Sequence, residues 1–356
     1  MKTVLVTGGC GFIGSHFVRL LLAQECWRVV NLDKLTYAGS SERLAGISEG
    51  AGYRFVQGDV TDSEQVDELF HGERPWAVVN FAAETHVDRS ILDASPFLTT
   101  NVVGARVLLE AARAHGLERF LQVSTDEVYG DADGKAPCHE LSLLWPSSPY
   151  AASKAAADLL CMAYQRTHAV PILIARSSNN YGPFQFPEKL VPVTIRNAAA
   201  GKDIPVYGDG SQRRDWLYVE DNCEALLAIL ERGEVGSIYN VGAGEERTNL
   251  TVVAAICQAL AAEIDQDVEA LRAHIRFVAD RPGHDRRYAL DTSKVRRDLG
   301  WSPQVSFEEG LRRTVRWSVA NAWWIEHVTS SAEFKGHEEA VYVRGWRAAG
   351  PQSVGV

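Results

Sequence analysis

Short runs of β-branched and other apolar residues alternate along the chain with longer segments whose apolar residues recur at helical spacing. The first run, residues 3–7, predicts a buried strand, and residues 12–24 predict the helix after it. Further short strands are predicted at 28–32, 54–57, 77–80, 120–124 and 172–175. This alternation is typical of a parallel sheet covered by helices on both faces. Such sheets bind ligands beyond the carboxyl ends of their strands, so we expect the functional residues directly after strands.

The rhythm changes from Ser177 onward, because proline and glycine cluster at residues 181–183 and 207–210. The predicted parts are a doubly wound α/β domain at 1–176 plus about 214–243, a smaller mixed α/β lobe at 177–213 plus about 244–329, and a C-terminal tail at 330–356. The pattern also predicts a helix at 219–231, a strand at 237–241 that rejoins the main sheet, and a last helix at 307–324. We expect the tail to be loosely held and assign it no role.

Composition narrows the class of protein. The 356 residues, 46% of them hydrophobic and 23% charged, can form large cores without disulfides or metals. Acidic residues outnumber basic ones by 46 to 36, which argues against a nucleic-acid partner. The six cysteines are scattered with no C-x-x-C motif, as expected of reduced thiols in the cytoplasm. No apolar run is long enough to predict a transmembrane helix or a signal peptide, so we expect no membrane partner.

A glycine-rich turn follows the first predicted strand. Gly8, Gly11 and Gly14 lack side chains, so backbone amides can approach a pyrophosphate where the helix begins. Asp33 follows the second strand, about 20 residues beyond Gly14, where it can accept hydrogen bonds from ribose hydroxyls and would repel a 2′-phosphate. Asp59, after the third strand, is placed to reach the adenine. This context predicts a Rossmann-like domain that binds NAD, rather than a glycine turn used only for tight packing.

Two further pairs of residues point to catalysis. Tyr150 and Lys154 lie one helical turn apart, and a nearby cation favours the phenolate of a tyrosine whose ordinary pKa is about 10. We expect Tyr150 to take a proton from a sugar hydroxyl while hydride leaves the same carbon. Asp126 and Glu127 follow the strand at 120–124. Burial and like charge push the pKa values of adjacent acids apart, so one can stay protonated near neutrality while the other acts as a base.

These motifs resemble those of the extended short-chain dehydrogenase/reductase family. The run from Ser124 to Gly130 resembles the signature of nucleotide-sugar 4,6-dehydratases. Segments that resemble the dTDP-glucose 4,6-dehydratases in particular lie at 33–39, 82–90, 179–183, 187–190, 214–216 and 281–285. The likeness keeps a consistent order over about 1–324.

The resemblance implies dehydration of dTDP-glucose with bound NAD. Hydride leaves C4 with Tyr150 as base, Glu127 removes the C5 proton, and Asp126 protonates the departing 6-hydroxyl before hydride returns to C6. The implied catalytic residues are Thr125, Asp126, Glu127, Tyr150 and Lys154. The implied NAD-binding residues are Gly8, Gly11, Phe12, Ile13, Gly14, Asp33, Lys34, Thr36, Asp59, Val60, Ala82, Ala83, Thr100, Tyr150, Lys154 and Asn180. The implied substrate-binding residues are Thr85, His86, Thr125, Asn179, Lys189, Leu190, Pro205, Tyr207, Arg214, Asn249, Arg281 and His284.

Two other functions stay open. A UDP-sugar 4-epimerase or decarboxylase shares the glycine turn and the Tyr150–Lys154 pair, but epimerisation needs no acid for a C6 leaving group. A non-catalytic NAD-sensing protein would not need Tyr150, Lys154 and both acids together. The resemblance also implies a homodimer formed through helices near 96–115 and 149–168. His86 and His284 have no acid or cysteine at ligand spacing, so we expect no metal site.

Overall fold

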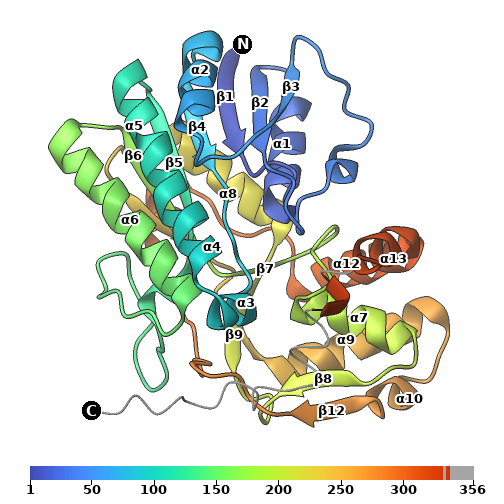
Figure 1. Ribbon diagram of the computed structural model, residues 1–356. Helices are drawn as coiled ribbons and strands as arrows, with labels where there is room; N and C mark the ends of the chain where they lie inside the picture. The colour runs from blue at the N-terminus through green and yellow to red at the C-terminus, as the bar shows by residue number, and fades with distance from the viewer. Residues whose placement is uncertain (332–333, 337–356) are drawn as a thin grey trace, which may run out of the picture.

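A seven-stranded parallel sheet forms the centre of the protein (Figure 1), seen in a computed structural model that describes residues 1–331 and 334–336. Its strand order is β10-β6-β5-β4-β1-β2-β3. The strands are β1 (Lys2–Thr7), β2 (Trp27–Asp33), β3 (Tyr53–Gln57), β4 (Ala77–Asn80), β5 (Arg119–Thr125), β6 (Ile172–Ser177) and β10 (Ile238–Val241). The predicted α/β class is therefore confirmed, and the strand predicted at 237–241 does rejoin the main sheet.

Helices cover both faces of this sheet, which explains why its strands are mostly apolar. One face is covered by α1 (Phe12–Ala23), α8 (Val219–Arg232) and α11 (Ser293–Leu299). The other is covered by α2 (Ser63–Glu73), α5 (Ala105–His115) and α6 (Pro149–His168). The chain reaches α5 through α3 (Val87–Leu92), the single turn α4 (Ser95–Phe97) and the π-helix η2 (Leu98–Gly104). Two short 3₁₀ helices, η1 (Ser41–Leu44) and η3 (Asp126–Tyr129), follow β2 and β5.

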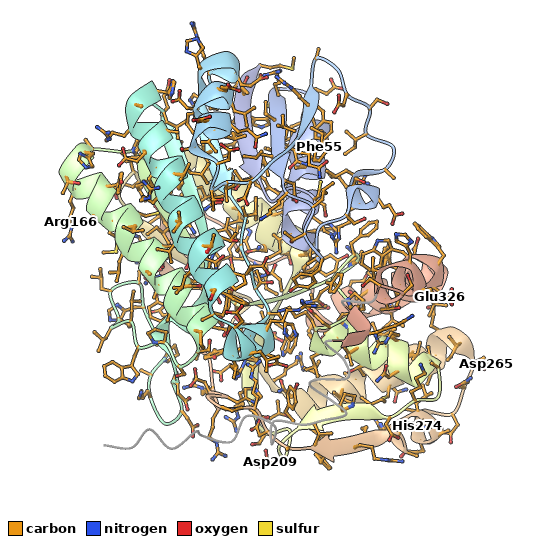
Figure 2. The ribbon with its side chains drawn as sticks, in the orientation of Figure 1. Phe55, Arg166, Asp209, Asp265, His274 and Glu326 are labelled. Atoms are coloured by element: carbon orange, nitrogen blue, oxygen red, sulfur yellow. The ribbon has the colours of Figure 1, made fainter. Side chains whose placement is uncertain are left out.

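A smaller lobe lies beyond the carboxyl ends of the strands, at the bottom of Figure 1. It holds a sheet in the order β11-β9-β7 and a parallel pair, β8 with β12. Its strands are β7 (Asn179–Tyr181), β8 (Ile204–Tyr207), β9 (Arg213–Tyr218), β11 (Glu246–Thr248) and β12 (Ile275–Val278). Its helices are α7 (Leu190–Ala199), α9 (Asn249–Ile264), α10 (Val268–Arg272), α12 (Phe307–Ala320) and α13 (Ala322–Thr329). Figure 2 shows Asp209, Asp265 and His274 on its outer edge, far from the main sheet.

Four segments differ from the prediction. One helix was expected at 307–324, but the structure has two, because α12 ends before Asn321 and α13 begins after it. The side-chain amide of Asn321 donates to the carbonyl of Trp317 at 2.8 Å. Residues 214–218, expected in the first domain, form part of β9 in the lobe, whereas α11, expected in the lobe, packs on the main sheet. Phe334 lies in the predicted loose tail but is 3% exposed and contacts the ring of Phe186, so chain packing extends at least that far.

None of the helices within the described ranges is long and apolar enough to cross a membrane.

Candidate active site

A cavity of about 310 Å³ lies where the main sheet faces the lobe. Its walls come from the carboxyl ends of β1, β2, β4, β5 and β6 and from the segment between β7 and α7. All residues predicted to hold the cofactor line it. The expectation that parallel strands would bring these residues together at one edge of the sheet is therefore met.

The glycine turn between β1 and α1 packs so closely against neighbouring backbone that it has no room for side chains. A Cβ atom on Gly14 would lie 2.3 Å from the carbonyl oxygen of Gly8, and one on Gly8 would lie 2.7 Å from the amide nitrogen of Ala82. Gly8 also has φ +72°, a conformation that side chains disfavour. No described side chain caps the start of α1, so its first amides remain available to an anion.

Asp33 ends β2 at the wall of the cavity, where the sequence predicts contacts with ribose hydroxyls. Its two carboxylate oxygens accept the amides of Cys10 and Leu35, each at 2.8 Å. Burial raises the pKa of Asp33, and these two hydrogen bonds oppose that shift, as does the nearby guanidinium of Arg43. The ammonium of Lys34 lies 2.6 Å from Asp59, which fixes both predicted residues at the rim.

The polar lining of the cavity fits a dinucleotide. Several buried oxygens have no hydrogen-bond partner among the described residues, including those of Ser124, Ser178, Asn179, Asn180 and Gln185. Buried polar atoms are normally paired, so these atoms indicate a ligand with many polar groups. Together with the glycine turn and Asp33, they fit NAD with its pyrophosphate over α1.

The acid pair follows β5 in η3. The hydroxyl of Thr125 accepts the amide of Glu127 at 3.3 Å and donates to Asp126 at 3.1 Å. Asp126 is 3% exposed, and burial together with the charge of Glu127 raises its pKa to about 8. Burial also raises the pKa of Glu127, which Arg281, Arg214 and Lys189 oppose. At neutral pH the geometry thus keeps Asp126 protonated, as required of an acid catalyst.

Tyr150 and Lys154 lie in the first turns of α6, and both side chains reach the same cavity. The sequence predicts that Lys154, aided by the positive nicotinamide of bound NAD, favours the phenolate of Tyr150, and the side chains of the protein by themselves do not have this effect. Burial and the carboxylates of Glu127 and Asp126 instead raise the pKa of Tyr150 above its ordinary value. The ammonium of Lys154 donates to the carbonyl of Val123 at 2.7 Å, and burial lowers the pKa of Lys154 to about 8.

The predicted substrate residues divide into two groups. Thr85, Thr125, Asn179 and Lys189 line the cavity. The other substrate residues do not line it: His86, Leu190, Pro205, Tyr207, Arg214, Asn249, Arg281 and His284.

The arginines of the second group are held by protein acceptors. Arg214 donates to the carbonyls of Arg213 and Asp285, at 2.7 and 2.8 Å. Arg281 is paired with Asp88 at 3.0 Å. Both arginines still act on Glu127, whose pKa they lower.

The cavity-lining residues that escaped prediction include Arg43 and Glu188. Arg43 is fully buried beside Asp33 and donates to the carbonyl of Cys10 at 2.9 Å. Glu188 accepts the hydroxyl of Tyr37 at 3.0 Å and so ties the segment before α7 to the loop after β2. Glu188 stood within a family-like motif at 187–190, which was a usable signal, whereas no pattern marks Arg43.

Comparisons with known proteins agree with this geometry. The GDP-mannose 4,6 dehydratase family model matches residues 5–314. A dTDP-glucose 4,6-dehydratase of Neisseria gonorrhoeae is 51% identical over 90% of this chain and 96% of its own. The dTDP-glucose 4,6-dehydratase of Streptomyces venezuelae, solved with NAD and TYD bound, is 46% identical with a TM-score of 0.86, over 92% of this chain and all of that chain.

An epimerase shares the fold more distantly. The UDP-glucose 4-epimerase of Thermus thermophilus, solved with NAD, is 33% identical with a TM-score of 0.80, over 90% of this chain and all of that one. The fold alone therefore does not separate the two activities, whereas sequence identity and the buried pair Asp126–Glu127 favour the dehydratases. With a family model over most of its length and a relative at half identity, this chain belongs to the dTDP-glucose 4,6-dehydratase family.

Proposed function

We propose that this protein dehydrates dTDP-glucose to dTDP-4-keto-6-deoxyglucose. The observation that carries the proposal is that the adjacent acids Asp126 and Glu127 line one cavity with Tyr150 and the glycine turn. Within this pair, the pKa of Asp126 is raised to about 8. Loss of water from C5 and C6 needs one group that gives a proton and one that takes a proton. In the proposed reaction Asp126, whose pKa is raised to about 8, gives the proton and Glu127 takes one.

The residues around C4 begin the reaction. Bound NAD would supply a reversible acceptor for the hydride of C4. Tyr150 takes the proton of the 4-hydroxyl, and Lys154 supplies the positive charge that stabilises the phenolate. Thr125 turns its single hydroxyl proton from Asp126 to the oxygen at C4. The ketone that results at C4 makes the C5 proton acidic.

The acid pair then carries out the elimination. Glu127 removes the proton from C5, and Asp126 gives its proton to the departing 6-hydroxyl. Once a hydride has been restored to C6, Glu127 returns its proton to C5. Asp126 has then lost a proton and Tyr150 has gained the one from the 4-hydroxyl, so the protein regains its starting state when a proton passes from Tyr150 to Asp126. The positive charges of Arg214, Arg281 and Lys189 support these roles because they oppose the pKa rise that burial imposes on Glu127.

The deciding experiment is to incubate the purified protein with dTDP-glucose and no added cofactor, and to weigh the product by mass spectrometry. A product lighter by one water supports the dehydratase. An unchanged mass with inverted C4 would identify a 4-epimerase, and no turnover by a protein that carries NAD would identify a sensor.

The oligomeric state and the compartment are also part of the proposal. We propose a homodimer formed through the face made by η2 and α6, because Leu98, Val103 and Leu159 are 53%, 41% and 55% exposed there. Apolar side chains gathered on neighbouring helices favour association. Analytical ultracentrifugation that finds a monomer would refute it.

We also propose a cytoplasmic location, which the six free cysteines support.

A further inference from the structure

Arg43, in the 3₁₀ helix η1, connects segments that are far apart in the sequence. Its Nη1 atom donates to the carbonyl of Cys10 at 2.9 Å and also to the carbonyl of Ala38. Its Nε atom donates to the carbonyl of Phe184 at 3.2 Å. The side chain is fully buried, and burial lowers the pKa of Arg43 to about 10, so the guanidinium stays charged at neutral pH. A buried charge requires such acceptors, so these bonds fix the positions of the carbonyls.

The connected segments are walls of the cofactor cavity. Cys10 belongs to the glycine turn, and Ala38 belongs to the loop between β2 and η1. Phe184 belongs to the segment between β7 and α7, whose following residues at 185–186 line the cavity, as Ala38 and Arg43 do. Arg43 therefore connects the part of the wall that comes from the first domain to the part that comes from the lobe.

The backbone at Phe184 is held in a conformation that few side chains adopt. Its φ is +65°, in the left-handed region that favours glycine. Such a conformation persists only where the surrounding structure holds it. Arg43 holds the carbonyl of Phe184, and the ring of Phe184 packs against those of Trp317 and Trp324, with centroids 4.5 and 5.6 Å apart. This part of the wall therefore keeps its shape through Arg43 and the aromatic rings of the lobe.

Trp324 packs against the guanidinium of Arg43. The centroid of its ring lies 5.2 Å from Cζ of Arg43, and Trp324 is fully buried. The attraction between a guanidinium and an aromatic ring is stronger where water is excluded. Trp324 lies on α13, which Figure 1 shows beneath the start of α1. Separating the lobe from the first domain at this wall would therefore break both the hydrogen bonds and the aromatic contact of a buried charge.

We propose that Arg43 is a positioning residue that keeps NAD in the cavity through successive turnovers. It acts through the carbonyls that it holds in the cavity wall and has no part in the proton transfers. In the proposed reaction the hydride that leaves C4 returns to C6, so a cofactor that left between these steps would end the cycle. This reason rests on the proposed function, whereas the retention of NAD can be measured without any sugar.

The test compares Arg43→Met with Arg19→Met. Arg19, on α1, also holds η1 in place, since it donates to the carbonyls of Arg43 and Ala45 at 2.6 and 3.1 Å. In the described part of the chain, however, Arg19 does not line the cavity. NAD-loaded protein is mixed with an excess of isotope-labelled NAD, and mass spectrometry of the bound cofactor at successive times gives the exchange rate. We expect exchange to be about 10- to 100-fold faster in Arg43→Met, since hydrogen bonds of a charged group contribute about that much, and unchanged in Arg19→Met.

Steady-state kinetics with dTDP-glucose separate the retention of NAD from catalysis. With saturating NAD, kcat of Arg43→Met should stay within about threefold of the wild-type value, because the groups that transfer protons are intact. After free cofactor is removed, Arg43→Met should lose activity on dilution and regain it when NAD is added. The wild type and Arg19→Met should stay active without added NAD.

A second variant guards against a folding defect in Arg43→Met. Arg43→Lys keeps the buried positive charge but replaces the planar fork with a single ammonium, which cannot donate to both sides of the wall in the same geometry. We expect NAD to exchange about tenfold faster in Arg43→Lys than in the wild type.

Three outcomes would overturn the inference. The first is wild-type exchange in both Arg43→Met and Arg43→Lys. The second is equally faster exchange in Arg19→Met and Arg43→Met, which would limit Arg43 to stabilising η1. The third is a loss of kcat at saturating NAD as large as the gain in exchange rate. A wild-type protein that retains NAD but does not dehydrate dTDP-glucose would refute the proposed function instead, and the exchange rates would still test Arg43.

Discussion

The burial of Asp126 determines how much of this residue is available as an acid. With its ordinary pKa of 3.8, about one Asp126 in 1,600 would carry a proton at pH 7; with a pKa of about 8, roughly nine in ten do. Burial and the adjacent Glu127 therefore raise the acid form about a thousandfold. If Asp126 protonates the departing 6-hydroxyl, its replacement must slow water loss and leave the earlier oxidation intact.

Asp126→Asn removes this proton donor at nearly constant size. We expect water loss to slow by about 10²- to 10⁴-fold, the usual contribution of a general acid. In the wild type, water loss should also decline as the pH rises through about 8, because Asp126 then loses its proton; in Asp126→Asn this dependence should vanish. Single turnovers quenched at successive times, with the sugar weighed by mass spectrometry, measure this step directly.

The oxidation step has to be followed separately, because it depends on the charge of Lys154 and burial lowers the pKa of Lys154 to about 8 as well. Oxidation and water loss therefore both change with pH in the same range. Near-ultraviolet absorbance of the reduced cofactor reports the oxidation, and Asp126→Asn should accumulate that signal. Asp133→Asn, in an exposed loop shortly after the acid pair, is the matched control and should behave as the wild type. Water loss at the wild-type rate in Asp126→Asn, or a wild-type water-loss step that is flat from about pH 6 to 9, would refute the reasoning.

Three further changes test the other parts of the site. Glu127→Gln should still reduce the bound cofactor but lose no water, because the C5 base is gone; normal turnover would contradict this role. Tyr150→Phe should block the first hydride transfer, so absorbance of reduced cofactor on mixing with dTDP-glucose would count against it. Gly14→Ala places a methyl group 2.3 Å from the carbonyl oxygen of Gly8, so the purified protein should retain about a tenth of the NAD or less. Gly72→Ala, whose added methyl meets no atom, should retain all of it.

The sheet and the cofactor end of the site were predictable from the sequence. Strands buried on both faces are mostly apolar, so β1 to β6 were visible as short apolar runs, although buried polar residues such as Asn31, Gln122 and Arg176 interrupt them. Parallel strands end at one edge, so Gly14, Asp33, Asp59 and Asn180 could be expected around one cavity although they are far apart in the chain. Sequence pattern and sheet topology are enough to predict a site residue when that residue is positioned by the end of a strand.

The lobe side of the site was less predictable, because its residues are placed by long-range polar contacts. Asp88 and Arg281 are 193 positions apart, and Tyr37 and Glu188 are 151 apart. No periodicity records such pairs, since each partner alone has the pattern of an exposed loop residue. Arg214, predicted to bind substrate, is likewise placed by contacts that no periodicity shows, since it donates to the carbonyls of Arg213 and Asp285.

The electrostatics of the cavity impose an order on the proton transfers. The negative charge of Glu127 raises the pKa values of both Asp126 and Tyr150, so an ionised Glu127 holds the proton on each of them. This helps Asp126, which must stay protonated, and opposes Tyr150, which must give its proton up. Lys154, held by the carbonyl of Val123, provides the compensating positive charge. Tyr150 therefore ionises most easily while Asp126 is still neutral, which places oxidation at C4 before Asp126 releases its proton to the leaving group.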